Sequence, residues 1–184
     1  MTKKTEFFLD KFTDNLSKHI QENKANFKEF CNFIDRNLLN KKKNNLYILG
    51  NGGSSSIASH CAVDFMKVLG VKASNFTDHN LITCYSNDYK YENWTKNALE
   101  IFCNDRDTVI LISSSGESKN IINTAKFLIK NKINLITFTG FKKNNSLSKL
   151  GKINFWINSK SYNEIEMCHH ILIVSAIDYL KENN

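Results

Sequence analysis

The spacing of apolar positions divides this chain into two parts. In residues 5–40 apolar side chains recur three or four positions apart, as in Phe8, Phe12 and Leu16, and this period is typical of amphipathic helices. A second stretch of the same kind follows with no strand-like run between them. We therefore expect residues 1–43 to form a helical hairpin whose aromatic surface packs on its own sheet or on another subunit.

Residues 44–184 alternate between short apolar runs and longer helical patterns. The apolar runs predict strands at 46–49, 71–76, 108–112, 133–138 and 153–157. Helical periodicity predicts helices at 54–69, within 79–103, at 118–131 and at 163–182. Because crossover helices cover both faces of a parallel sheet, the expected fold class is α/β. We expect a three-layer α-β-α sandwich with a five-stranded parallel sheet.

Composition places the chain among globular proteins of one domain. It has 184 residues, of which 41% are hydrophobic and 23% charged, and these values suit a single compact core. The charged first residues and the lack of a long apolar segment predict neither a signal peptide nor a membrane span. The five cysteines are scattered and form no C-x-x-C pair, so we expect reduced thiols and a cytoplasmic location.

The net charge of +7 is compatible with a nucleic-acid partner. The lysines, however, are spread along the chain, and the local clusters at 41–43 and 142–143 lie beside asparagines in expected loops. They form no basic stripe interleaved with aromatic residues, which single-strand binding requires. We therefore attribute the charge to a compositional bias toward Lys, Asn and Ile rather than to nucleic-acid binding.

Two glycine–serine loops are the most informative segments. Each follows an apolar strand and opens a helix: Gly50–Ser56 and Ser113–Ser118. Unpaired backbone N–H groups, the positive end of a helix dipole and serine hydroxyls suit an anion, above all a phosphate. Neither loop has the G-x-G-x-x-G spacing of dinucleotide sites or the Gly-Lys-Ser/Thr of a P-loop. Since both follow strand carboxyl ends, we expect them to converge on one phosphorylated small molecule.

With these loops in this order, the chain resembles the sugar isomerase (SIS) domain family and, within it, the phosphoheptose isomerases. The resemblance covers essentially the whole chain and rests on Gly-Asn-Gly-Gly-Ser at 50–54 with His60, Ser-Asn-Asp-Tyr at 86–89 and Ile-Ser-Ser-Ser-Gly-Glu-Ser at 112–118. It implies a flavodoxin-like sheet and the interconversion of sedoheptulose 7-phosphate and a heptose 7-phosphate for surface polysaccharide. It also implies a homo-oligomer, a dimer of dimers with sites completed across subunits.

The resemblance further implies roles for particular residues. The sugar-contacting loop corresponds to Asn51, Gly52 and Gly53. The phosphate cradle corresponds to four serines, Ser113, Ser114, Ser115 and Ser118. Asn87 and Asp88 correspond to a segment that lines the substrate site, and His60 corresponds to a zinc ligand.

Two positions depart from the family's catalytic pattern. Four residues after the ligand histidine the family has a glutamate that acts as base and ligand, and this chain has Asp64. On the last helix Glu166 aligns with the family's glutamine, and Val174 occupies the position of its acid or ligand histidine. Valine neither binds a metal nor carries a proton, so the family's standard mechanism is incomplete here.

Helix geometry offers a replacement for the missing histidine. At about 100° per residue, His170 falls roughly 40° from both Glu166 and Val174, and His60 and Asp64 are an i, i+4 pair. Our hypothesis is a rearranged cluster in which Asp64, Glu166 and His170 are catalytic and, with His60, can bind zinc or another divalent ion. In the alternative interpretation His170 is a core or interface histidine, and the two carboxylates only cap or pair locally.

Two functions therefore stay open at this point. The first is a phosphosugar aldose–ketose isomerase, which the retained His60 and the carboxylates of Asp64 and Glu166 favour. The second is a non-catalytic phosphosugar-binding protein with a regulatory or scaffolding role, which the valine at 174 favours. Metal analysis separates the two, because a sensor needs no stoichiometric metal.

Overall fold

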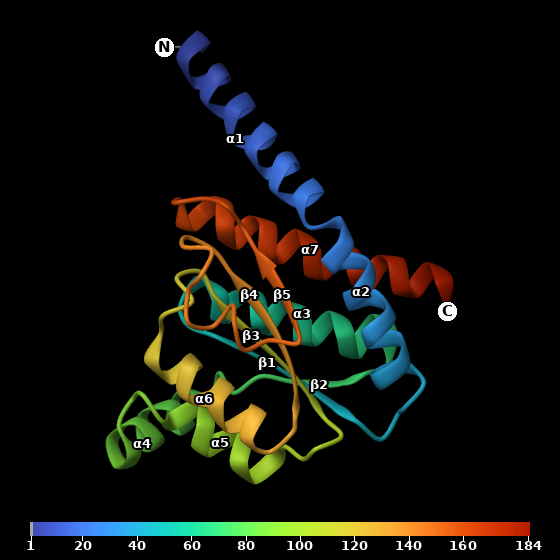
Figure 1. The fold of residues 1–184 in the computed structure, drawn as a ribbon, viewed down its shortest axis with the longest axis vertical. Coiled ribbons are helices and arrows are strands. Elements are labelled where there is room, and N and C mark those ends of the chain that lie inside the picture. Colours follow the sequence, from blue (N-terminus) through green and yellow to red (C-terminus); the bar gives the residue numbers. More distant parts are fainter. Residues whose placement is uncertain (1) are drawn as a thin grey trace.

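The computed structural model describes residues 2–184, which form a five-stranded parallel sheet between two layers of helices (Figure 1). The strands lie in the spatial order β2-β1-β3-β4-β5, and every neighbouring pair is parallel. Their bounds are β1 Asn45–Gly50, β2 Lys72–Ser74, β3 Thr108–Ser113, β4 Asn134–Thr139 and β5 Ile153–Trp156. The expected α/β sandwich is confirmed, with β2 shorter than the apolar run that predicted it.

Helices cover both faces of this sheet. One face carries α2, α3 and α7, and the other carries α5 and α6, with α4 beside them (Figure 1). Their bounds are α2 Lys24–Ile34, α3 Gly53–Leu69, α4 His79–Tyr89, α5 Trp94–Phe102, α6 Lys119–Lys130 and α7 Tyr162–Asn183.

Strand β3 shows how the sequence produces the two cores. Successive side chains of a strand point to opposite faces. Ile110 and Ile112 therefore join the core beneath α3 and α7, and Val109 and Leu111 join the core beneath α5 and α6. All residues of β3 are buried, as expected for a parallel strand that is covered on both sides.

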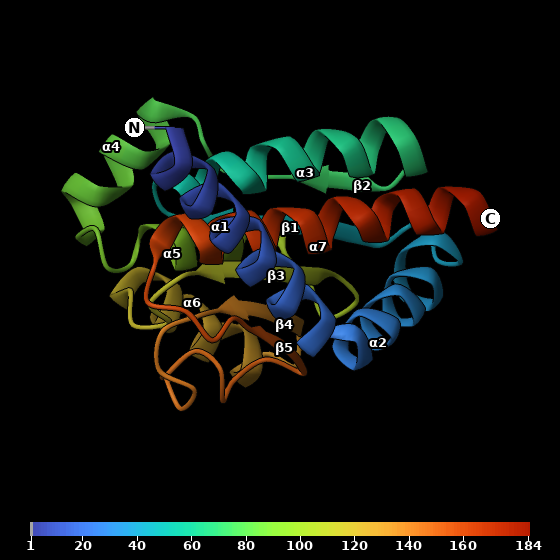
Figure 2. The same cartoon turned by 90° about the horizontal axis from the view of Figure 1, so that it is seen from above.

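The N-terminal part consists of α1 Thr2–Glu22, α2 and a π-helical turn at Asp35–Leu39. The two predicted helices are present, but they diverge at Asn23 instead of lying along each other as a hairpin (Figures 1 and 2). Helix α1 lies against α7 and extends beyond the body of the molecule. On its outer part Phe7 and Phe8 are 69% and 68% exposed, so this chain's own sheet does not cover them.

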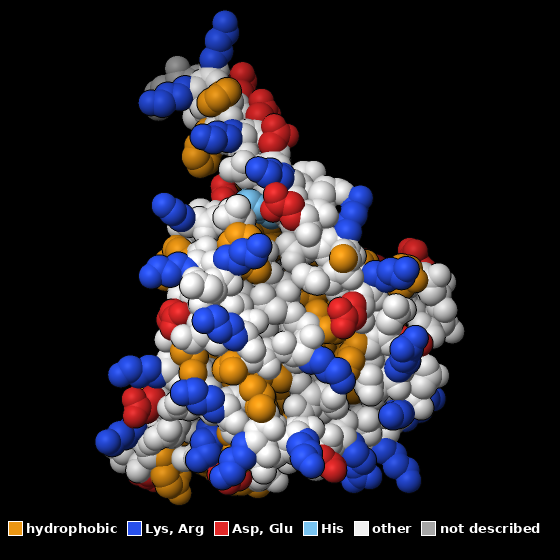
Figure 3. Space-filling view, in the orientation of Figure 1, with side chains coloured by type: hydrophobic (Ala, Val, Ile, Leu, Met, Phe, Trp, Pro, Cys, Tyr) orange, Lys and Arg blue, Asp and Glu red, His pale blue; other side chains and the backbone are white. Residues whose placement is uncertain are grey.

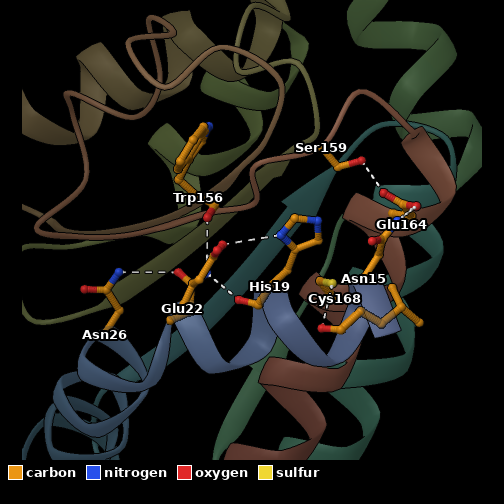
Figure 4. Close-up of polar contacts among 10 residues, drawn as sticks. Asn15, His19, Glu22, Asn26, Trp156, Ser159, Glu164 and Cys168 are labelled. Carbon is orange, nitrogen blue, oxygen red and sulfur yellow. Dashed lines mark hydrogen bonds and ion pairs between the residues drawn. The ribbon is translucent and has the colours of Figure 1, made fainter. Parts of the chain in front are cut away.

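Side-chain amides fix the junction of α1 and α2 on β5. Asn23 Nδ2 donates to the carbonyl of Trp156 (3.1 Å), and Asn26 Nδ2 donates to the carbonyl of Asn154 (3.0 Å). Figure 4 shows this junction beside the start of α7. The divergence at Asn23 therefore follows from contacts that each helix makes with the sheet and with α7.

The surface and the cysteines can be compared with the expectations about a membrane span, a basic stripe and reduced thiols. No helix within residues 2–184 is long and apolar enough to cross a membrane. On the face drawn in Figure 3, lysine and arginine side chains are spread among acidic ones rather than gathered in one stripe. The cysteines are free thiols, and Cys31, Cys61 and Cys168 are buried within the apolar core.

Candidate active site

The two glycine–serine loops meet at the carboxyl ends of the neighbouring strands β1 and β3. The chain leaves β1 toward β2 on one side and leaves β3 toward β4 on the other, so a topological switch point lies between them. The loops and the start of α7 enclose a cavity of about 140 Å³. Its lining residues are Asn51, Ser54, Ile112, Ser113, Ser114, Ser115, Ser118, Tyr162 and Glu166. The structure thus brings Asn51, the four cradle serines and Glu166 to one place.

The first loop begins α3 through a glycine turn. Gly52 has φ +55° and ψ −124°, a conformation that glycine adopts without the usual steric penalty. A Cβ atom on Gly53 would collide with the carboxylate of Glu166. The turn requires the first glycine, and the close approach of a carboxylate from α7 requires the second.

The second loop is held by a neighbouring segment of the chain. The backbone N–H of Leu147 donates to the carbonyl of Gly116 at 3.0 Å. The carboxylate of Glu117 accepts from the backbone N–H of Ser146 (2.9 Å) and from its hydroxyl (2.8 Å). These two hydrogen bonds hold the pKa of Glu117 below its usual value. Glu117 therefore fixes the loop from outside and does not enter the cavity.

The serines of this loop, here called the serine cradle (Ser113, Ser114, Ser115 and Ser118), line the cavity. Ser114 Oγ is buried and has no hydrogen-bond partner within residues 2–184, a state that costs about 1–3 kcal/mol. Ser118 is the N-cap residue of α6, so the first N–H groups of that helix are directed toward the same cavity. The serine cradle is therefore built to receive a hydrogen-bond acceptor with negative charge.

Asn51 is oriented by two neighbours that the sequence reasoning missed. Asn51 and Asn120 exchange amide hydrogen bonds of 2.9 Å in both directions, and Tyr91 Oη donates to Asn51 Oδ1 at 3.2 Å. On the far side of this pair lies an adjoining cavity of about 400 Å³. It is lined by Asn51, Lys90, Tyr91, Glu92, Ser118, Lys119 and Asn120. The position of Tyr91 just after the Asn-Asp-Tyr segment was the available signal.

Asn87 and Asp88, expected at the substrate site, lie on α4 instead. Both side chains are exposed, and Asn87 Nδ2 donates to Asp88 Oδ1 at 3.0 Å. Neither belongs to the described residues that line the two cavities. Within one subunit these two residues are therefore not brought to the cradle.

His60, Asp64 and His170, here called the histidine cluster, lie together where α3 packs on α7. His60 Nε2 lies 3.0 Å from Asp64 Oδ2, and the rings of His60 and His170 meet edge to face with centroids 4.7 Å apart. His170 Nε2 is buried and has no hydrogen-bond partner in the described part of the chain. Three of the four residues of the proposed cluster are thus in contact.

Burial sets the protonation of the two α7 side chains. It lowers the pKa of His170, and the neighbouring His60 lowers it further, against an opposing effect of Asp64. Burial also raises the pKa of Glu166. A carboxyl with raised pKa at the cavity wall suits proton transfer. His170 follows Glu166 by four residues on α7 and is not among the described residues that line the cavity.

His169 and Val174 serve the packing of α7. The ring of His169 is fully buried against Phe138, and its Nε2 lies 3.1 Å from the carbonyl oxygen of Thr139. Burial lowers the pKa of His169 to about 4, so the ring is neutral. Val174 packs against the same apolar core and supplies no polar group.

A comparison with known families identifies the domain that carries the two loops. The SIS domain model matches residues 7–140. The chain belongs to the SIS domain family. This SIS domain is 31% identical over 172 residues to a phosphoheptose isomerase of Thermodesulfovibrio yellowstonii, covering 88% of this chain and 84% of that protein. It is 29% identical over 136 residues to one of Aquifex aeolicus, with 70% of each chain covered.

Solved structures agree on the fold of this SIS domain. The phosphoheptose isomerase GmhA from Neisseria gonorrhoeae superposes with a TM-score of 0.89 at 19% identity, covering 98% of both chains. A phosphoheptose isomerase from Francisella tularensis gives a TM-score of 0.86 at 18% identity over 99% of this chain and 100% of that one. The resemblance inferred from the two loops is confirmed.

Proposed function

We propose that this SIS domain is a phosphosugar aldose–ketose isomerase that converts sedoheptulose 7-phosphate to a heptose 7-phosphate. The observation that carries the proposal is the entry of the Glu166 carboxylate into the cavity formed by the two glycine–serine loops. One end of that cavity offers donors to a phosphate, and its wall offers a proton-transfer group. Relatives named phosphoheptose isomerase, at about 30% identity, support the same activity.

The serine cradle is the phosphate-binding end in this proposal. The unpartnered Ser114 hydroxyl and the N-terminus of α6 donate to the phosphate oxygens. Asn51, fixed by Asn120, lies between the cradle and the sugar hydroxyls. The phosphate holds the sugar so that its carbonyl end reaches toward α7.

Isomerisation moves one proton between adjacent carbons through an enediolate. The ionised carboxylate of Glu166 removes a proton from the carbon beside the carbonyl, and the resulting carboxyl returns it to the former carbonyl carbon. A proton also passes between the two oxygens, and the neutral imidazole of His170 is the group assigned to that transfer. Asp64 accepts from His60 and holds the histidine cluster in place.

Zinc or another divalent ion belongs to this proposal. No group of three or more His, Cys, Asp or Glu side chains in residues 2–184 is arranged to hold a metal as it stands. The donor types fit, because His170 Nε2 lacks a partner in the described chain and the ring of His60 touches it. The residues that would hold an ion are His60, Asp64, Glu166 and His170, where it would polarise the substrate carbonyl.

The proposal also includes a homo-oligomer, a dimer or tetramer whose subunits share sites. Helix α1 extends past the body of the molecule with Phe7, Phe8 and Leu9 exposed by 60% or more. Apolar side chains gathered in this way are typical of surfaces that another protein covers. The proposed setting is the cytoplasm, where the heptose would supply surface polysaccharide synthesis.

The test is NMR of the protein with sedoheptulose 7-phosphate in deuterated buffer, with and without added zinc. We expect product formation and deuterium incorporation beside the carbonyl. The absence of both product and deuterium incorporation, with and without zinc, would overturn the proposal and favour a binding-only role for this SIS domain.

A substitution then tests the histidine cluster. His170→Ala should reduce turnover and metal content while the affinity for the phosphosugar is retained. The matched control is His79→Ala, which removes an exposed imidazole at the start of α4. If His170→Ala leaves both turnover and metal content intact, the rearranged cluster is wrong.

A further inference from the structure

Two lysines occupy the cavity that adjoins the serine cradle. Lys90 and Lys119 line it together with Tyr91 and Glu92, and the two cavities share Asn51 and Ser118 as a common wall. The cradle itself has no such charge, since none of the described residues lining it is Lys or Arg. It does contain the carboxylate of Glu166. A phosphate dianion in the cradle therefore meets hydrogen-bond donors but no cationic side chain, and the lysines of the adjoining cavity are the nearest candidates for one.

The backbone of Lys90 is strained in a way that a surface lysine does not require. Lys90 has φ 68° and ψ 147°, a combination that essentially only glycine adopts. Hydrogen bonds on both sides hold it there: Asn93 Nδ2 donates to the carbonyl of Tyr89 (3.0 Å), and Asn123 Nδ2 donates to that of Glu92 (2.9 Å). Strain of this kind persists where surrounding contacts enforce it, and it concentrates at functional sites.

Lys119 is also locally unfavourable. It is the first residue of α6, directly after the N-cap Ser118, where the helix dipole disfavours a cation. The first turn of α6 contains no acidic residue, so the described part of this turn offers no compensation within the helix. One cavity is thus lined by a lysine with an unfavourable backbone conformation and a lysine at an unfavourable helix position. Conflicts of this kind with local structural preferences are expected at functional positions.

We propose that Lys90 and Lys119 form a cationic wall that binds the phosphate group of the substrate from the side of the adjoining cavity. The inference rests on the proposed function and extends it by two binding residues. The strained backbone of Lys90 is retained because the side chain reaches the phosphate from this position. The carboxylate of Glu92, in the same cavity, limits the net charge of the wall to one positive unit when both lysines are protonated.

Three variants of one position separate charge from backbone strain. Lys90→Gly removes both, Lys90→Gln removes only the charge, and Lys90→Arg keeps both. The matched control is Lys132→Gly: Lys132 also has a positive φ of 59°, but it precedes β4 and so lies at the opposite end of the sheet from the cradle. The measurements are the melting temperature and the dissociation constants of sedoheptulose 7-phosphate and of inorganic phosphate.

We expect Lys90→Gly to raise the melting temperature by roughly 2–4 °C and to weaken binding of both ligands by roughly tenfold. Lys90→Gln and Lys119→Gln should weaken binding to a similar extent, with no gain in stability for Lys90→Gln. Lys90→Arg should bind as the parent does. Lys132→Gly should gain stability with unchanged binding. The binding advantage of the parent should also shrink as salt rises.

Unchanged affinity for both ligands in Lys90→Gly and Lys119→Gln would overturn the cationic wall. So would a loss in Lys90→Gly that Lys90→Gln does not share, because the cause would then be backbone flexibility. Binding of inorganic phosphate needs no turnover, so the proposal survives if sedoheptulose 7-phosphate proves not to be isomerised. Conversely, isomerisation can be observed in a protein whose lysines contribute nothing.

Discussion

The serine cradle lies between the end of β3 and the start of α6, the histidine cluster lies where α3 packs on α7, and different features of the chain define them. The cradle is made of backbone turns, a helix N-terminus and hydroxyls, and the hydrogen bonds of Glu117 and Leu147 hold it from outside. The histidine cluster consists of long side chains on α3 and α7, and His170 Nε2 lacks a partner within the described chain. Backbone geometry defines the first region, and side-chain identity at single positions defines the second.

The difference teaches how binding and catalysis can change separately in this fold. The donors of the cradle come from its own loop and from the N-terminus of α6, so its affinity for phosphate does not depend on the side chains of the histidine cluster. A proton-transfer site loses its function when one side chain is shortened or displaced, because the reacting groups must be positioned to within about an ångström. Asp64 and Val174, which the sequence resemblance predicts to differ from the family's catalytic residues, lie outside the set of described residues that line the cradle cavity.

The largest expected effect separates the two regions most clearly. Glu166→Gln removes the proposed proton carrier and should lower kcat by on the order of 10³-fold, with little change in affinity for the phosphosugar. Deuterium incorporation measured by NMR gives the rate, and calorimetry gives the affinity. Glu182→Gln, an exposed change in the last turn of α7, is the control and should have no effect. Equal kcat in both variants would remove Glu166 from the mechanism.

An intermediate effect is expected from the cradle. Ser114→Ala removes a buried hydroxyl that has no partner within residues 2–184. Because that hydroxyl is unsatisfied without ligand, the free energy of unfolding should rise by about 1 kcal/mol, while KM should rise by roughly tenfold. Chemical denaturation and steady-state kinetics measure the two quantities. A loss of stability would mean that the hydroxyl is already satisfied in the free protein.

The smallest effect concerns the outer support of the cradle. Ser146 holds the pKa of Glu117 below its ordinary value, so this carboxylate stabilises the fold at pH above the ordinary glutamate value and loses that contribution as pH falls through its lowered pKa. In Glu117→Gln the melting temperature should therefore fall less steeply as the pH is lowered. KM should rise by a few-fold at neutral pH with kcat unchanged. Thermal melts across pH 3–7 test the first expectation. The same dependence of melting temperature on pH in both proteins would show that the Glu117–Ser146 hydrogen bonds contribute nothing to stability.

The fold was largely predictable because its signals are local. The alternation of apolar runs and helical periods fixed the strands β1, β3, β4 and β5 to within a residue or two. The divergence of α1 and α2 was not predictable, because it depends on Asn23 and Asn26 meeting carbonyls of β5 some 130 residues away in sequence. A helical period indicates that a helix exists but not which partner it packs on.

The candidate site likewise contains residues that local sequence predicts and residues that only the tertiary fold brings in. The serines and glycines of the two loops could be predicted from the sequence, because a Gly/Ser pattern determines the backbone conformation of its own segment. Tyr91, Asn120 and Tyr162 were missed because only the tertiary fold brings them to the loops. Asn87 and Asp88 were expected at the cavity by analogy alone, and in one subunit they remain on the exposed face of α4.

The amides of Asn23 and Asn26 have a consequence beyond positioning α1. Strand β5 is an outer strand of the sheet, and an outer strand presents carbonyls that a foreign strand can pair with. Here the carbonyls of Asn154 and Trp156 are already occupied by those two amides, and the opposite outer strand, β2, is only three residues long. Neither border of the sheet offers a long template for strand addition, so the single chain is protected against edge-to-edge aggregation.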